Sequence, residues 1–118
     1  MIEPKAQVFA QITKLKTTYP NLKVLQERQK DGTIPDFPAI TFRIEDDRPA
    51  HTLDKDIPYQ RIVARIDIWT NTSKESGKLL LALESKMKEI DYLLSTHFDI
   101  LDQGKGEKYS HVTTQFIY

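Results

Sequence analysis

The chain has 118 residues, of which 39% are hydrophobic and 29% charged, and its seventeen basic side chains balance seventeen acidic ones. This length fits a single domain over residues 1–118, and the balanced charge argues against a general polyanion binder or a sequence-specific nucleic-acid partner. The absence of cysteine excludes disulfides, thiolate zinc sites and cysteine catalysis, and it fits a reducing compartment.

The N-terminal segment, MIEPKAQVFAQITKLK, is amphipathic and carries early charges. It lacks the continuous apolar region of a signal peptide. No run in the chain approaches the roughly 20 apolar residues that cross a bilayer. We therefore expect a protein that is made and folded in the cytoplasm, with no membrane partner.

The first predicted element is an N-terminal helix of about four turns. Pro4 suits its first turn, where a missing N–H costs no hydrogen bond, and the stretch Tyr19–Asn21 stops it. Its apolar residues recur at spacings of four, three and four and so share one helical face: Val8, Ile12, Leu15 and Tyr19.

Two strands follow, and we expect them to pair. The stretch Leu22–Arg28 alternates moderately between apolar and polar residues and is ended by Lys30–Gly32. The next stretch, FPAITFRIE, alternates strictly, as expected for a half-buried strand. Its residues Ile40, Phe42 and Ile44 face one way, while Thr41, Arg43 and Glu45 face the other.

A charged stretch, Asp46–Ile57, comes next and contains almost no apolar anchor. It is longer than ordinary hairpin loops, so we interpret it as either a functional or a disordered loop. Its aspartates lack the spacing and terminal glutamate of a calcium loop, which favours a solvated loop over a metal site. Its charged residues and histidine are Asp46, Asp47, Arg48, His51, Asp54, Lys55 and Asp56.

The stretch Tyr59–Thr70 has the clearest strand alternation in the chain and leads directly into a second helix. Thr72 or Ser73 is the candidate N-cap of that helix. Its apolar residues recur at spacings of three, four, three and four: Leu80, Leu83, Met87, Ile90 and Leu94. Further leucines widen this stripe, so it needs a sheet or a partner beneath it.

A hairpin closes the chain. It joins the stretch Phe98–Gln103 through a glycine-containing turn to the β-rich stretch Tyr109–Tyr118, whose residues Val112, Thr114 and Phe116 share one side. The element order is therefore α-β-β-β-α-β-β. We predict an α+β fold with an antiparallel sheet of about four to five strands and two helices packed on one face.

Known catalytic and cofactor patterns are missing from the sequence. The histidines form no H-x-x-x-H pair, and the turn GKGEK matches no phosphate-binding loop because a strand, not a helix, follows it. There is also no G-x-S-x-G nucleophile motif. We therefore predict no enzyme activity, no cofactor and no metal.

The non-core face of the strand Tyr59–Thr70 is more informative. Arg61, Arg65 and Asp67 lie on it between Val63 and Trp69, a mixture of aromatic, aliphatic and arginine side chains that is enriched at protein interfaces. Two interpretations of Trp69 stay open at this stage. It is either partly exposed as an interface residue or packed against a helix end.

Several sequence segments resemble those of one protein family. They are FPAITFRIEDDRP, a proline-led strand followed by a charged loop; RIVARIDIWTNTSKESGKLLLALESKM, a strand that ends in aromatic-Thr and runs into a helix; and the closing HVTTQFIY. These resemble the small tail-completion proteins of long-tailed phages and prophages, also called tail terminators or tail-to-head joining proteins. The resemblance covers the chain from about Phe37 to Tyr118 at the level of pattern.

The resemblance implies a structural virion protein of the tail and neck, assembled in the host cytoplasm. Such a protein caps the tail tube as a hexameric ring and joins the tail to the head connector, so its partners are copies of itself, the tail tube protein and the connector protein. By position in the pattern, Arg61, Arg65 and Trp69 become candidate subunit-interface residues. Two segments become candidate contact loops: Asp46–Ile57, with the seven residues named above, and the turn Gln103–Lys108, with Lys105, Glu107 and Lys108. The balanced charge departs from the acidic bore expected of a DNA conduit.

Two other functions are alternatives to tail completion. One is a small cytoplasmic adaptor or regulatory domain with a ligand pocket between the sheet and the long helix. The other is a hydrolase that uses His111 with an acidic residue from the Asp46–Asp56 loop.

The ring interpretation also makes a prediction, namely that Trp69→Ala weakens ring formation and leaves the fold intact.

Overall fold

The computed structural model describes residues 3–26, 37–51, 58–99 and 109–118. Its elements are α1 (Pro4–Thr13), the 3-10 turn η1 (Lys14–Thr17), β1 (Lys23–Leu25), β2 (Ala39–His51), β3 (Pro58–Thr70), α2 (Ser73–Lys88), β4 (Leu93–Asp99) and β5 (Ser110–Ile117). The predicted α+β class and the order α-β-β-β-α-β-β are confirmed.

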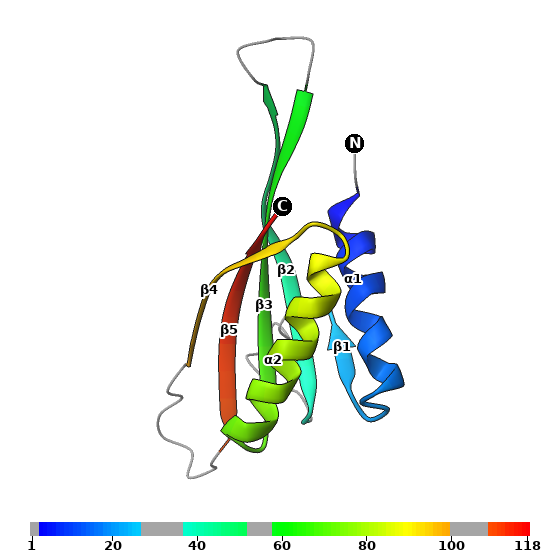
Figure 1. Ribbon diagram of the computed structural model, residues 1–118, viewed down its shortest axis with the longest axis vertical. Coiled ribbons are helices and arrows are strands. Elements are labelled where there is room, and N and C mark those ends of the chain that lie inside the picture. Colours follow the sequence, from blue (N-terminus) through cyan, green and yellow to red (C-terminus); the bar gives the residue numbers. More distant parts are fainter. Residues whose placement is uncertain (1–2, 27–36, 52–57, 100–108) are drawn as a thin grey trace.

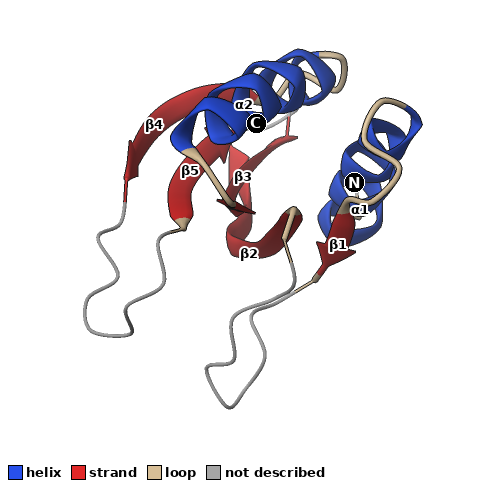
Figure 2. Ribbon diagram, turned by 90° about the horizontal axis from the view of Figure 1, so that it is seen from below, coloured by secondary structure: helices blue, strands red, loops and turns tan. Residues whose placement is uncertain are grey.

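The strands form one five-stranded sheet in the order β1-β2-β3-β5-β4. Both helices lie on the same face of this sheet (Figures 1 and 2). The pairs β2–β3, β3–β5 and β4–β5 are antiparallel, whereas β1 runs parallel to β2, with Val24 opposite Ile40. The sheet is thus mixed, and the prediction of a purely antiparallel sheet is wrong for the pair β1–β2. Alternation within a strand identifies its buried face but carries no information about its direction.

The first helix forms as the sequence pattern indicates. Pro4 occupies its first turn, and the Glu3 carboxylate accepts a hydrogen bond of 3.2 Å from the backbone N–H of Lys5. Val8, Ile12 and Leu15 are buried, but the last of them lies in η1, because the helix tightens to 3-10 geometry after Thr13. The predicted helix of about four turns is therefore α-helical only over its first part.

The second helix starts at the predicted cap and ends earlier than predicted. The backbone N–H of Glu75 donates to Oγ1 of Thr72, the N-cap, over 3.2 Å. The helix ends at Lys88, although the apolar spacing continues to Leu94, because Asp91 adopts a left-handed φ of 67°. The Tyr92 and Asp91 N–H groups then bond back to the Met87 and Lys88 carbonyls, which is the pattern of a Schellman cap.

Because α2 ends earlier than predicted, the fourth strand also begins earlier than predicted. Leu94 belongs to β4, where it lies opposite Phe116, and not to the helix. The predicted strand Phe98–Gln103 is wrong in its bounds, because β4 covers Leu93–Asp99. Its antiparallel pairing with β5 is confirmed.

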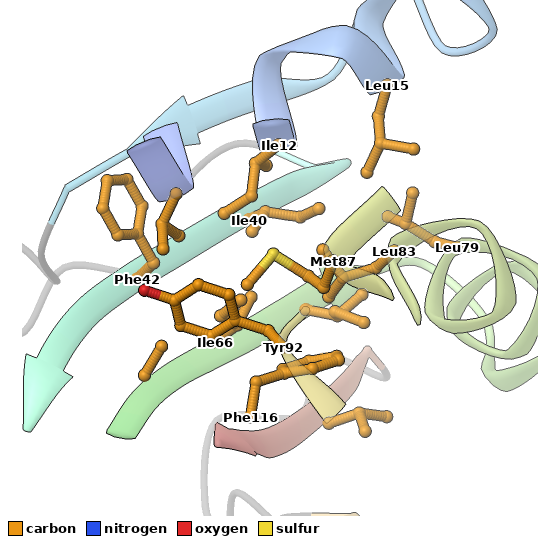
Figure 3. Close-up of a cluster of buried hydrophobic side chains, with 14 of the residues drawn as sticks. Ile12, Leu15, Ile40, Phe42, Ile66, Leu79, Leu83, Met87, Tyr92 and Phe116 are labelled. Atoms are coloured by element: carbon orange, nitrogen blue, oxygen red, sulfur yellow. The ribbon is translucent and has the colours of Figure 1, made fainter. Parts of the chain in front are cut away.

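The core lies between the sheet and the two helices. Figure 3 shows Leu79, Leu83 and Met87 from α2 directed toward Ile66 of β3 and Ile40 of β2, and all five are buried. Each such side chain contributes about 1.5–3 kcal/mol by leaving water. Among the described residues, no helix combines the length and the apolar character that crossing a bilayer requires.

The strands β2 and β3 extend beyond the rest of the sheet. Their pairing continues out to His51 opposite Pro58, whereas β5 pairs with β3 only over Val63–Thr70 and β1 covers β2 only over Ala39–Thr41. We call the projecting two-stranded part, Arg48–His51 with Pro58–Arg61, the arm; it forms the top of Figure 1.

The prediction that Asp46–Ile57 is a loop is wrong for its first part, because β2 continues to His51. Asp46, Asp47, Arg48 and His51 lie on β2. The strand is hard to see in the sequence because a β-bulge at Glu45 interrupts it: Ile44 lies opposite Ala64, and Asp46, two residues later, lies opposite Val63. The extra residue reverses the alternation, so the period of two fails at the point where the strand continues.

Candidate functional site

The candidate site is the sheet face opposite the two helices, which we call the outer face. Cross-strand register defines its members, because residues directly opposite each other share a face. They include Thr41, Arg43 and Asp46 of β2; Arg61, Val63, Arg65, Asp67 and Trp69 of β3; Phe98 of β4; and His111, Thr113 and Gln115 of β5.

Trp69 is fully buried on this face, with an exposed fraction of 0%. Its indole N–H donates to the Thr41 hydroxyl over 3.2 Å, and its ring stacks on His111 with centroids 3.6 Å apart. Tyr109 adds a third ring, 6.3 Å from Trp69. Of the two interpretations left open by the sequence, the partly exposed Trp69 is therefore wrong, and the rings packed against it belong to His111 and Tyr109.

Next to this stack lies a polar network around Asp67. Oδ2 of Asp67 is 3.2 Å from Nε2 of His111, and Oδ1 accepts hydrogen bonds from the Thr113 hydroxyl over 2.5 Å and from Nε of Arg65 over 3.3 Å. Burial of Asp67 works to raise its pKa, but the hydrogen bonds from His111 and Thr113, with the charges of Arg65 and His111, lower the pKa below its ordinary value. The carboxylate thus stays ionised and joins β3 to β5.

The two predicted interface arginines differ in their surroundings. Nε of Arg65 also donates to the Thr113 hydroxyl over 3.0 Å, so this side chain belongs to the Asp67 network. The Arg61 side chain is 53% exposed and its Nε lies 3.9 Å from Oδ2 of Asp46. An exposed ion pair at that distance adds little stability, which leaves the Arg61 guanidinium accessible to a partner.

The predicted residues are thus brought together in part. Arg61 and Arg65 share the outer face with Trp69, and Asp46 lies beside Arg61. Asp47 lies opposite Ile62, one position closer to the arm. Of the remaining predicted contact residues, Arg48 and His51 occupy strand positions in the arm. The others lie outside the described residues: Asp54, Lys55, Asp56, Lys105, Glu107 and Lys108.

His111, the histidine of the hydrolase alternative, has an acidic neighbour, but not one from the predicted loop. Its partner is Asp67 of β3. The imidazole is 4% exposed and stacks on Trp69, which is the environment of a packed side chain. Within the described part of the chain, no three His, Asp or Glu side chains gather as metal ligands would.

Sequence reasoning missed the contributions of Thr113, Tyr109 and Phe98. Alternation placed His111 and Thr113 on one side of the last strand and Trp69 and Asp67 on one side of the third. The missing information was that β5 pairs with β3 so that Trp69 faces His111 and Asp67 faces Thr113. Register between strands distant in sequence depends on the complete fold.

The chain was compared with protein-family models, with curated proteins and with solved structures. No protein-family model matches the chain, and no curated protein matches it. Among solved structures, the chain is similar to a chain described as "Virion of native gene transfer agent (GTA) particle", with 11% sequence identity and a TM-score of 0.48 over 97% of this chain and 91% of that chain. A likeness at that level carries no argument about function.

Proposed function

We propose that this protein is a structural component of a phage or prophage virion that caps the tail tube and joins it to the head connector as a ring. The pattern-level resemblance of Phe37–Tyr118 to tail-completion proteins motivates the proposal. The observation that carries it is the arm, a two-stranded ribbon that projects from a compact body (Figure 1).

An isolated two-stranded ribbon is marginally stable in water, so a projecting one gains stability when another surface covers it. The arm also exposes strand edges, which are natural sites for pairing with another chain. In the proposed function, the arm contacts the tail tube or the connector.

A closed ring of identical subunits requires two different complementary surfaces on each subunit. We assign one of them to the outer face around Arg61 and Arg65. Trp69 is buried, so its part in this proposal is to hold the outer face in shape rather than to contact a neighbour. The proposed partners are copies of the chain, the tail tube protein and the connector protein, and no cofactor takes part.

The genes that flank the coding sequence test the proposal first. Connector and capsid genes upstream, with a tail-tube gene downstream, are the expected result. An operon of metabolic or regulatory genes would overturn the tail role and favour the adaptor alternative. For a ligand-binding adaptor, the space between the sheet and α2 would have to hold a ligand, and buried side chains such as Leu83 and Met87 occupy it.

A second experiment tests the assigned ring surface. Negative-stain electron microscopy and native mass spectrometry should reveal rings of the wild-type protein, alone or on tail tubes. Arg61→Glu should abolish the rings, because it reverses an accessible charge on the proposed interface. Lys74→Glu makes the same charge change on the exposed side of α2 and should leave the rings intact. Rings that survive Arg61→Glu would remove this residue from the interface.

A further inference from the structure

The strand β4 is the last strand of the sheet, beyond β5, and none of the described residues pairs with its other edge. It is also unusually exposed for a strand with large apolar residues: Leu93 is 59% exposed and Phe98 is 57% exposed. A long edge strand with exposed apolar side chains is a template for pairing with another strand. We propose that a second copy of this chain pairs antiparallel with β4, about a two-fold axis that passes beside Phe98.

The three residues around Phe98 explain why the occupant is another copy of the same strand. Phe98 lies opposite Thr113 and is on the outer face, whereas His97 and Asp99 lie opposite Thr114 and Val112 and are on the helix side. All three side chains are exposed. This part of β4 is regular, because its bulge lies between Leu94 and Thr96.

A two-fold axis beside Phe98 makes these residues complementary to themselves. Phe98 then lies directly opposite the second copy's Phe98, which forms a cross-strand aromatic pair. His97 lies opposite the second copy's Asp99, and Asp99 opposite the second copy's His97, so two imidazole–carboxylate pairs form by symmetry.

The neighbouring register toward the bulge lacks this complementarity. The next register toward the bulge that keeps the outer face on one side sets Phe98 against the second copy's Thr96 and His97 against the second copy's His97. Both the aromatic pair and the two imidazole–carboxylate pairs are then absent. The side chains of β4 therefore favour the register with Phe98 opposite Phe98 over this alternative.

This pairing goes beyond the proposed tail role and does not rest on it. A two-fold contact uses the same surface on both subunits, whereas contacts around a ring join two different surfaces. The β4 pair is thus a state of the free chain, and its failure would leave the ring proposal standing.

The absence of cysteine from the chain makes a direct test possible. Directly opposite residues of antiparallel strands have Cα atoms about 4.5–5.5 Å apart, within the range that a disulfide spans. Mild oxidation of Phe98→Cys should therefore give a covalent dimer. Leu81→Cys is the control, since Leu81 is 71% exposed and lies on α2 rather than on the edge strand. Equal cross-linking of the two variants would overturn the proposal.

A charge exchange tests the register. Sedimentation equilibrium should show a wild-type dimer, and His97→Asp should weaken it about tenfold, because two like-charge pairs replace two complementary ones. The double variant His97→Asp/Asp99→His exchanges the two residues and should restore dimer formation, while Leu81→Lys should not change it. A monomeric wild-type protein at high micromolar concentration would overturn the pairing, and so would a double variant as weak as His97→Asp.

Discussion

The imidazole of His111 stacks on the indole of Trp69, with the ring centroids 3.6 Å apart and an angle of 17° between the ring planes. The two residues are direct cross-strand neighbours, Trp69 on β3 and His111 on β5. This stack forms a small second core on the outer face, opposite α1 and α2.

The first prediction concerns that stack. Trp69→Ala should lower the free energy of unfolding by about 3–5 kcal/mol, because it leaves a cavity where a fully buried ring was. Urea denaturation followed by circular dichroism measures the loss. Trp69→Phe keeps a ring but loses the hydrogen bond to Thr41 and should cost less. An unchanged midpoint for Trp69→Ala would return this residue to the interface role inferred from the sequence.

The second prediction concerns Asp67 and pH. Its pKa in the folded state lies below the ordinary value of 3.8, so the ionised carboxylate stabilises the fold. This contribution is complete well above pH 3.8 and is lost as the pH falls through the lower, folded-state pKa. Asp67→Asn should therefore reduce stability at neutral pH and flatten its decline in acid. Glu84→Gln, which removes a carboxylate from α2, is the matched control for the loss of one negative charge.

The third prediction concerns the contact between the helices. Nε2 of Gln11, on α1, donates to the Lys86 carbonyl over 2.7 Å and to Oε2 of Glu89 over 2.5 Å. Gln11→Ala should cost about 1–3 kcal/mol, since it leaves the end of α2 without these partners. Glu89→Ala removes one of the two acceptors and a largely exposed ion pair with Lys86, 3.8 Å long, which adds little stability, so it should cost less in the same thermal unfolding measurement. A larger loss for Glu89→Ala would contradict this ranking.

The fourth prediction concerns Tyr92. Its hydroxyl is buried and has no hydrogen-bond partner among the residues that the structure describes. Burial, followed by Tyr118 and Asp47, raises its pKa to about 12. Tyr92→Phe should therefore leave stability unchanged at neutral pH or raise it by up to about 1 kcal/mol. The wild-type protein should lose stability as the pH rises from 10 toward 12, because the unfolded chain ionises first, and Tyr92→Phe should lose less. A clearly less stable Tyr92→Phe at pH 7 would mean that the hydroxyl has a partner.

The sequence predicts those parts of the fold that depend on local periodicity. The alternation through Ile40 and Phe42 and the helical stripe through Leu83 and Met87 correspond to buried faces. Features set by single backbone positions or by long-range pairing escape such reasoning. Asp91 ends α2 although Leu94 keeps the helical spacing, and the parallel direction of β1 leaves no trace in its own residues.

The candidate site shows the same limit. Alternation correctly puts Trp69 and Arg61 on the face without helices, but whether each is exposed depends on the residue opposite. Trp69 faces His111 and is buried, whereas Arg61 lies at the base of the arm, beyond the end of the β3–β5 pairing, and remains exposed. Composition alone cannot separate these two outcomes, because both depend on which strand lies alongside.

Because of the bulge at Glu45, the direction of the arm depends on the number of residues in β2 rather than on the identity of any side chain. Because Glu45 is the unpaired extra residue, its deletion would keep every cross-strand pair from Asp46–Val63 outward while removing the local kink and added twist. A one-residue deletion would therefore change the direction of the arm while keeping its strand register. Small-angle scattering would register the change as a different maximum dimension, and an unchanged value would show that the bulge does not orient the arm.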